Sequence, residues 1–155
     1  MYNPDNELNA MCNVRPAVEK DEEAVFGLAV QLSTKFVVER TAFSAIFPQL
    51  LKAEDVYLHV ADEAGIVIAY LLGWTHLAFY SNGPAGWVQE LVVHPEYRRN
   101  GVGKLLMEHF ECWTAARGGR LVSLATRGAP EFYLALGYRE SATYFKKAIN
   151  PDNGR

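Results

Sequence analysis

The pattern of hydrophobic and polar positions predicts short strands that alternate with amphipathic helices. Apolar runs and apolar–polar alternation, which are typical of strands, occur at residues 12–18, 56–61, 66–80, 87–93, 121–126 and 142–149. Apolar residues spaced three or four positions apart, as on one face of a helix, occur at residues 21–32, 39–52, 101–117 and 130–137. The elements follow one another as βααβββαβαβ, which predicts an α/β fold.

Glycine, proline and asparagine residues mark the turns between these elements. Residues 63–65 are expected to turn the chain between two strands, and residues 81–86 to form the next turn. Gly73 interrupts an otherwise long strand and predicts a bend in it. Asp21 is expected to cap the first helix. The strands at 56–61 and 66–80 are therefore expected to pair as a hairpin.

The length and composition are those of one globular domain. The 155 residues are 50% hydrophobic and 21% charged, which is enough apolar surface for one packed core. Residues 1–10 and 150–155 are polar, and we expect them to be flexible tails. We therefore expect a single domain over residues 1–155.

Charge and cysteine content argue against several classes of protein. The 15 lysines and arginines and 18 aspartates and glutamates give a net charge of -3, which argues against binding nucleic acid through bulk positive charge. Two cysteines are too few for a disulfide framework and favour a reducing compartment, the cytoplasm. The longest apolar run, at residues 66–72, is too short to span a membrane. The histidines show no metal-ligand spacing, so we expect no metal site.

A glycine-rich turn joins the strand at 87–93 to the helix that starts at residue 101. The first backbone N–H groups of a helix have no partner within the helix, and together with the helix dipole they attract a phosphate. Gly101 and Gly103 let the backbone approach such an anion, but the spacing differs from a Walker loop and lacks the third glycine of a dinucleotide fingerprint, which would fall at Leu106. The candidate phosphate-binding residues are Arg98, Arg99, Asn100, Gly101, Val102, Gly103 and Lys104. Spacing alone leaves an ordinary surface turn as the alternative.

Two motifs favour the phosphate site. Arg98-Arg-Asn-Gly101-Val-Gly103, after Leu91-Val-Val-His-Pro95, resembles the acetyl-CoA motif of the GNAT family of N-acetyltransferases. Downstream, Ala129-Pro-Glu-Phe-Tyr-Leu-Ala-Leu-Gly-Tyr138 resembles that family's A-x-x-F-Y-x-x-x-G-F/Y segment. Together with the element order, the resemblance covers residues 12–149. It implies a GNAT-like acyl-CoA N-acyltransferase fold, with a mixed, mostly antiparallel sheet flanked by helices.

The resemblance also implies that acetyl-CoA is the cosubstrate. Its pyrophosphate would lie on the backbone amides of residues 98–104, and its pantetheine arm beside the strand residues Leu91, Val92 and Val93. In relatives this strand splays from the next one, so an unpaired amide around Val92 would bind the thioester oxygen.

Two residues are candidates for the proton transfers. The resemblance places the hydroxyl of Tyr133 near the coenzyme sulfur, where it would act as general acid, and core packing of the ring is the alternative. Glu90 precedes the coenzyme-binding strand and is the best candidate for the base that deprotonates the amine. A solvated glutamate, or one paired with an arginine, is the alternative for Glu90. Glu39 and Glu140 are weaker candidates for the base.

The residues suggest direct transfer of the acetyl group to a primary amine. Neither cysteine lies in a matched motif and no Ser-His-acid arrangement can be recognised, so no covalent nucleophile is evident. A small-molecule amine is the preferred acceptor. A protein N-terminus or lysine, and a non-catalytic acyl-CoA-binding or sensing module, are the alternatives. The aromatic residues near the turn at 81–86 are typical of cross-strand packing or of a homodimer surface.

Overall fold

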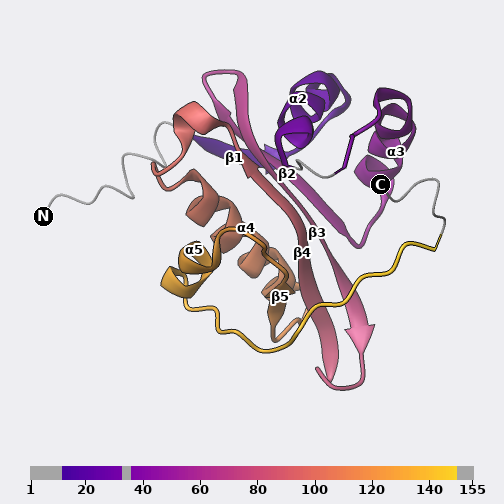
Figure 1. Cartoon of the computed structure of the whole chain (residues 1–155), viewed down its shortest axis with the longest axis vertical. Coiled ribbons are helices and arrows are strands. Elements are labelled where there is room, and N and C mark those ends of the chain that lie inside the picture. The colour runs from indigo at the N-terminus through magenta and orange to yellow at the C-terminus, as the bar shows by residue number, and fades with distance from the viewer. Residues whose placement is uncertain (1–11, 33–35, 150–155) are drawn as a thin grey trace, which may run out of the picture.

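The computed structural model describes residues 12–32 and 36–149, which form one five-stranded sheet with helices on both faces (Figure 1). The strands, in their order across the sheet, are β1 (Asn13–Pro16), β2 (Val56–Glu63), β3 (Ile66–Ala78), β4 (Gly83–Val93) and β5 (Val122–Leu124). Neighbouring strands are antiparallel except β4 and β5, which are parallel. The predicted mixed, mostly antiparallel sheet is therefore confirmed. The predicted tails at 1–10 and 150–155 lie outside the described residues.

The helices divide between the two faces of the sheet. They are α2 (Glu22–Leu32), α3 (Arg40–Lys52), α4 (Val102–Ala116) and α5 (Pro130–Ala135), with the 3-10 turns η1 (Glu19–Asp21) and η2 (Pro95–Tyr97). Helices α2 and α3 cover one face, here called the α2–α3 face, and α4 and α5 cover the other, the α4 face (Figure 1). None of the helices in the described ranges is long and apolar enough to cross a bilayer.

Each face carries its own hydrophobic core because successive side chains of a strand point to opposite faces. The core of the α2–α3 face contains Ala17, Val25, Leu28, Ala29, Phe47, Leu58, Val60, Tyr70, Leu72 and Val92. The core of the α4 face contains Cys12, Tyr57, Ala61, Ile68, Ala69, Leu71, Val88, Val102, Leu105, Leu106, Met107 and Phe110. The central strands β2 to β4 contribute side chains to both cores. Membership of a core therefore shows which face of the sheet a residue of these strands points to.

The hairpins of the sheet follow the predicted turn chemistry. Ala64 and Gly65, between β2 and β3, have φ values of 52° and 85°, the left-handed pair that a tight hairpin turn requires. Gly73 lies at a register shift between β3 and β4, and a Cβ there would sit 2.7 Å from the carbonyl oxygen of Trp87. This irregularity agrees with the predicted bend at Gly73. Its extra residue is Gln89 on β4, and the close approach of Trp87 explains why position 73 needs a glycine.

The ends of β4 and β5 differ from the prediction. β4 begins at Gly83 rather than at residue 87, and β5 covers only Val122–Leu124 rather than residues 121–126. Pro84 is tolerated inside β4 because it lacks an N–H on the β5 side of the strand, where pairing starts only at Gly86, whose N–H donates to Leu121. The short β5 leaves the second half of β4 without a partner strand on that side in the described chain.

The strand predicted at 142–149 is wrong. Residues 139–149 form no helix or strand, and all of them are exposed. An extended segment becomes a strand only when another strand pairs with its backbone, and none in the described chain does so. The ammonium of Lys146 lies 3.8 Å from the ring centroid of Phe36, so this C-terminal segment runs from α5 to the connection between α2 and α3 (Figure 1).

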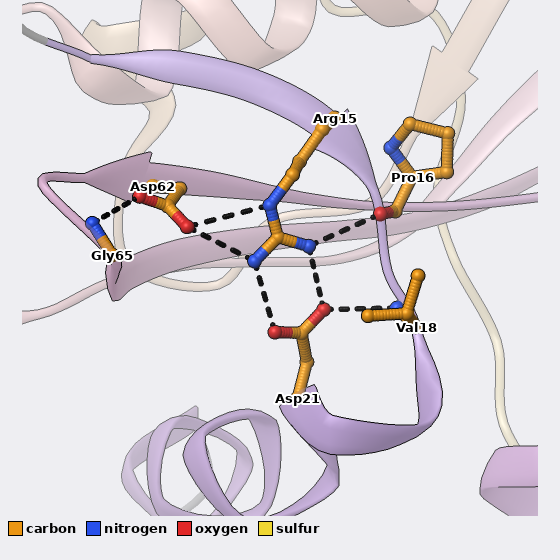
Figure 2. Close-up of polar contacts among 6 residues, drawn as sticks. All are labelled: Arg15, Pro16, Val18, Asp21, Asp62 and Gly65. Atoms are coloured by element: carbon orange, nitrogen blue, oxygen red, sulfur yellow. Dashed lines mark hydrogen bonds and ion pairs between the residues drawn. The ribbon is translucent and has the colours of Figure 1, made fainter.

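Arg15 ties β1 to the start of α2 and to the β2–β3 hairpin (Figure 2). Its guanidinium donates to Asp21 at 2.7 Å and to Asp62 at 3.0 Å, and Asp21 also accepts from the backbone N–H of Val18 at 2.9 Å. Asp21 lies immediately before α2, as the sequence predicts, although its carboxylate serves the turn that precedes the helix. The hydrogen bonds from Arg15 hold the pKa of Asp21 below its usual value.

Candidate active site

The second half of β4 presents free backbone groups at the gap beyond β5. The N–H of His94 donates to the carbonyl oxygen of Ile68 on β3 at 2.8 Å, so Val92, two residues earlier, also directs its N–H toward β3. Leu91 and Val93 alternate with these residues, and their N–H and C=O groups point to the β5 side, where β5 has ended. The sequence predicted an unpaired amide around Val92. The pairing register indicates that the free N–H groups are those of its two neighbours, Leu91 and Val93.

The turn between β4 and α4 opens onto the end of this gap. Arg99 and Gly101 have φ values of 64° and 81°, and Gly101 is the N-cap residue of α4. Backbone N–H groups at such left-handed turns and at helix starts form anion-binding concavities. The guanidinium of Arg98 donates to the carbonyl oxygen of Val93 at 3.0 Å, which fastens the turn to the end of β4. Arg98, Arg99 and Asn100 are exposed, and the two arginines give this turn positive charge.

The next residues anchor the start of α4 to the core and to α5. Val102 is buried in the core of the α4 face. A Cβ on Gly103 would lie 3.1 Å from the ring of Phe132, so the missing side chain lets α5 pack closely on the start of α4, a role that spacing did not predict. Lys104 lies one turn before Glu108, with 3.9 Å between Nζ and Oε1.

Glu90 is half-buried on the α2–α3 face. It lies opposite Leu72 and two residues before Val92, both of which belong to the core of that face. Its Oε2 accepts a hydrogen bond of 2.8 Å from the hydroxyl of Tyr70. Burial raises the pKa of the Glu90 carboxyl, while the hydrogen bond from Tyr70 acts in the opposite direction. Glu90 is thus only partly exposed, and its hydrogen-bond partner is a tyrosine rather than an arginine, a partner that was missed from the sequence.

Tyr133 lies on the opposite face of the sheet from Glu90. Helix α5 places its ring against the core of the α4 face, edge-on to Phe132 with 4.9 Å between the ring centroids. Its hydroxyl has no hydrogen-bond partner within residues 12–32 and 36–149. Burial raises the pKa of this hydroxyl, which keeps its proton at neutral pH. The structure thus shows the core packing of the Tyr133 ring, and its role as general acid stays a prediction.

The two candidate residues flank the sheet plane at the point where the sheet opens. Glu90 faces α2 and α3, Tyr133 faces α4, and the unpaired half of β4 lies between the two faces. Glu90 and Tyr133 therefore lie on opposite faces of the sheet, with the unpaired half of β4 between those faces.

The other titratable candidates lie elsewhere. Glu39 is the N-cap residue of α3, and Glu140 is exposed in the C-terminal segment. The ring of His59 stacks on Tyr57 with 3.7 Å between centroids, and burial lowers the pKa of His59 to about 4. In the part of the chain that the structure describes, no three histidine, cysteine, aspartate or glutamate side chains are grouped as metal ligands.

Comparison with solved structures finds the same fold in other proteins. A transcriptional regulator from Bacillus halodurans C-125 superposes with a TM-score of 0.82 at 20% identity, covering 89% of this chain and 99% of the other. AAC(6')-Iy, solved in complex with the bisubstrate analog CoA-S-monomethyl-acetylneamine, superposes with a TM-score of 0.76 at 21% identity, covering 89% of this chain and 99% of the other. At these identities the likeness shows a shared fold.

Sequence comparison identifies the family. The profile of the acetyltransferase (GNAT) domain matches residues 54–140, which include the turn at the start of α4, Glu90 and Tyr133. The aminoalkylphosphonate N-acetyltransferase of Salmonella typhimurium (strain LT2) is 31% identical over 146 residues, covering 90% of this chain and 92% of the relative. The chain belongs to the GNAT family of acetyltransferases.

Proposed function

We propose that this protein transfers the acetyl group of acetyl-CoA to the primary amine of a small molecule. The observation that carries the proposal is the gap beside β4. Free amides line its edge, the start of α4 lies at one end, and Glu90 and Tyr133 flank it on opposite faces. The function of the family, acetyl transfer, fits this arrangement of donors, acid and base.

The cosubstrate would lie along β4. The backbone amides of residues 98–104 and the start of α4 would hold its pyrophosphate, with Arg98 and Arg99 adding positive charge. The free N–H groups of Leu91 and Val93 and the carbonyl of Leu91 would pair with the amides of the pantetheine arm, as an added strand does. Val92 contributes by packing, because its side chain is buried on the α2–α3 face.

The amine would enter from the α2–α3 face. An alkylammonium with a pKa near 10 is almost wholly protonated at neutral pH and cannot attack, so Glu90 accepts the proton that frees the amine. The nitrogen then forms a bond to the acetyl carbon while the carbon–sulfur bond breaks. Backbone amides at the gap donate to the carbonyl oxygen as it gains negative charge. The ammonium loses two protons in all, of which one balances the new thiol and one goes to solvent.

Tyr133 would assist the leaving group on the α4 face. Its hydroxyl donates a proton to the departing sulfur and recovers one afterwards. Because a thiol has a pKa of about 8.5, the thiolate already leaves readily, and the expected contribution is modest. No enzyme-bound acyl intermediate is needed, since the amine attacks the thioester directly.

The acceptor class is proposed from the most informative relative. The Salmonella protein is an aminoalkylphosphonate N-acetyltransferase, and it matches this chain over 90% of its length. We therefore propose a short aminoalkyl compound that carries an anionic group as the acceptor, in preference to a protein N-terminus or lysine.

An acceptor panel with detection of released thiol tests the function. The panel contains aminoalkylphosphonates, amino carboxylates and amino alcohols of equal chain length, together with peptides that offer a free N-terminus or a lysine. The proposal expects turnover of a short aminoalkyl acid that far exceeds turnover of any peptide. Preference for a peptide would reassign the acceptor. Tight acetyl-CoA binding without turnover of any amine would instead favour the non-catalytic binding module.

We also propose that the protein is a homodimer. Phe145 and Ile149 of the C-terminal segment are 87% and 89% exposed, and Leu77 and Phe79 near the tip of the β3–β4 hairpin are exposed as well. Apolar surface of this kind is usually covered by a partner. Sedimentation should show a dimer that Phe145→Glu weakens, and a monomeric wild-type protein at micromolar concentration would contradict this proposal.

A single domain and a cytoplasmic location remain proposals of the same kind. All strands of the described chain belong to one sheet, which supports one domain. Cys12 and Cys112 are both free thiols, and Cys112 is exposed, as suits a reducing compartment.

A further inference from the structure

The base proposed for the reaction sits in a place that disfavours its charge. Glu90 is half-buried on the α2–α3 face, and the hydroxyl of Tyr70 is its hydrogen-bond partner at 2.8 Å. We infer that Tyr70 is a positioning residue, which holds the Glu90 carboxylate ionised and oriented toward the acceptor amine. The inference rests on the proposed function, in which Glu90 removes the proton of the amine.

The sheet register brings the two side chains together. Tyr70 on β3 lies opposite Val92, and Glu90 on β4 lies opposite Leu72, so Tyr70 and Glu90 are diagonal neighbours on one face. Tyr70 is 1% exposed within the core of that face. Because packing fixes the ring of Tyr70, its hydroxyl is held in one position. In that position it lies within hydrogen-bond distance of the Oε2 atom of Glu90.

The chemistry of the pair suits a base that must stay ionised. Burial raises the pKa of Glu90 and so favours the protonated form, which cannot accept a proton, whereas a donor at Oε2 favours the carboxylate. Burial and the adjacent Glu90 raise the pKa of Tyr70 far above the neutral range, so its hydroxyl stays a donor. The hydrogen bond occupies Oε2 and leaves Oε1 for the proton of the amine.

Charged groups of the covering helices do not replace Tyr70. Arg40 of α3 pairs with Glu23 at 2.6 Å and with Glu22 at 3.8 Å, both on α2. Lys52, at the end of α3, is exposed. Within the described residues, burial and the hydrogen bond from Tyr70 are therefore what set the ionisation of Glu90.

The test is the pH profile of kcat/KM for the acceptor in Tyr70→Phe. A hydrogen bond to a charged group is worth about one pK unit or more, so the acidic limb is expected to move up by about one pH unit. The loss should be about tenfold on the acid side of the limb and should largely disappear above it. A merely structural role for Tyr70 would leave the limb where it is.

Tyr57→Phe is the matched control. Tyr57 lies on the neighbouring strand β2, is also 1% exposed, and has a buried hydroxyl without a partner in the described chain. Loss of the Tyr57 hydroxyl should leave the acidic limb of the kcat/KM profile at its wild-type pH. An equal shift in Tyr57→Phe would overturn the inference, because the effect would then belong to any buried tyrosine of the sheet.

The carboxyl resonance of Glu90, followed by carbon-13 NMR and assigned with Glu90→Gln, separates this inference from the proposed function. A pKa of Glu90 that rises in Tyr70→Phe supports the inference whatever the acceptor proves to be. An unchanged pKa of Glu90 overturns it even if acetyl transfer is confirmed. Should Tyr70→Phe not fold, 3-fluorotyrosine in place of Tyr70, a stronger donor, should lower the pKa of Glu90, and no change would again overturn the inference.

Discussion

The two faces of the sheet contribute to the site in different ways. On the α4 face the proposed cosubstrate site is built mainly from backbone, namely the left-handed turn at Arg99 and Gly101 and the free amides of β4. On the α2–α3 face the site is built from two side chains, the half-buried Glu90 and the buried Tyr70. Backbone donors suit a ligand shared by all members of a family, whereas side chains can differ with each acceptor.

This difference makes the two regions separable by experiment. Changes at the turn should affect binding of acetyl-CoA, and changes around Glu90 should affect the chemistry and the acceptor. A substitution that affected both equally would show that the two regions act as one unit.

The largest effect is expected at the base. Glu90→Gln should lower kcat/KM for the acceptor at pH 7 by about 1000-fold and remove the acidic limb of the profile, since the variant cannot accept the proton of the amine. Acetyl-CoA affinity, measured by calorimetry, should stay within about twofold. Glu54→Gln, at an exposed position before β2, is the control. An acidic limb that persists in Glu90→Gln would remove Glu90 from the chemistry.

A charge at the start of α4 should produce the next largest effect. Gly101→Asp places a carboxylate where the pyrophosphate is expected, and it should weaken acetyl-CoA binding by about 100-fold through repulsion and competition for the same N–H groups. Gly101→Asn is the matched neutral control, because asparagine also tolerates the positive φ of this residue. Equal affinities of the two variants would argue against an anion at this helix start.

A smaller effect is expected at the proposed acid. Tyr133→Phe should lower kcat by about tenfold, with little change in acetyl-CoA affinity, because the thiolate needs only partial help to leave. Tyr138→Phe is the control, since that hydroxyl is already committed to Glu111 at 2.7 Å. If both variants kept wild-type kcat, the ring of Tyr133 would serve packing alone.

The smallest effect on activity is expected far from both regions. Asp21→Asn should cost about 2 kcal/mol of folding free energy at pH 7, because it breaks the ion pair with Arg15. The folded-state pKa of Asp21 is lowered, so this stability is present above the unfolded pKa of about 3.9 and is lost as the pH falls through the folded value.

Denaturant unfolding at pH 7 and at acid pH measures this loss. The difference between wild type and Asp21→Asn should shrink as the pH falls, and Glu19→Gln, an exposed neighbour, should change little. A difference that grows at acid pH would contradict the assigned pKa direction. A changed acetyl-CoA affinity would contradict the separation of this network from the site.

Local signals in the sequence predicted most of the fold. The hairpin at 63–65, the bend at Gly73 and the helix from residue 101 each depend on residues a few positions apart, and all three are confirmed. The length of β5 and the fate of residues 142–149 depend on which distant strands pair, which local propensity does not encode. The strand predicted at 142–149 is absent although its apolar pattern is present, because no other strand of the described chain pairs with this segment.

In the candidate site, too, features that depend on consecutive residues could be predicted, and features that depend on distant residues could not. The turn at 98–104 could be recognised because its glycines and arginines are consecutive in the sequence. The partner of Glu90 could not, since Tyr70 lies 20 residues away in a strand where a tyrosine indicates core packing. The available signal was the register, and the shift at Gly73 changes the pairing between β3 and β4. Counting alternate positions across that shift would have assigned the wrong neighbour.

The central claim is that acetyl-CoA binds along the free edge of β4 with its pyrophosphate at the start of α4. Backbone amide exchange followed by NMR, with and without acetyl-CoA, tests it most directly. The account predicts slower exchange at Leu91, Val93 and residues 99–103, with little change at Val92, whose N–H faces β3. Unchanged exchange at these residues, with protection on another element such as α2, would contradict it.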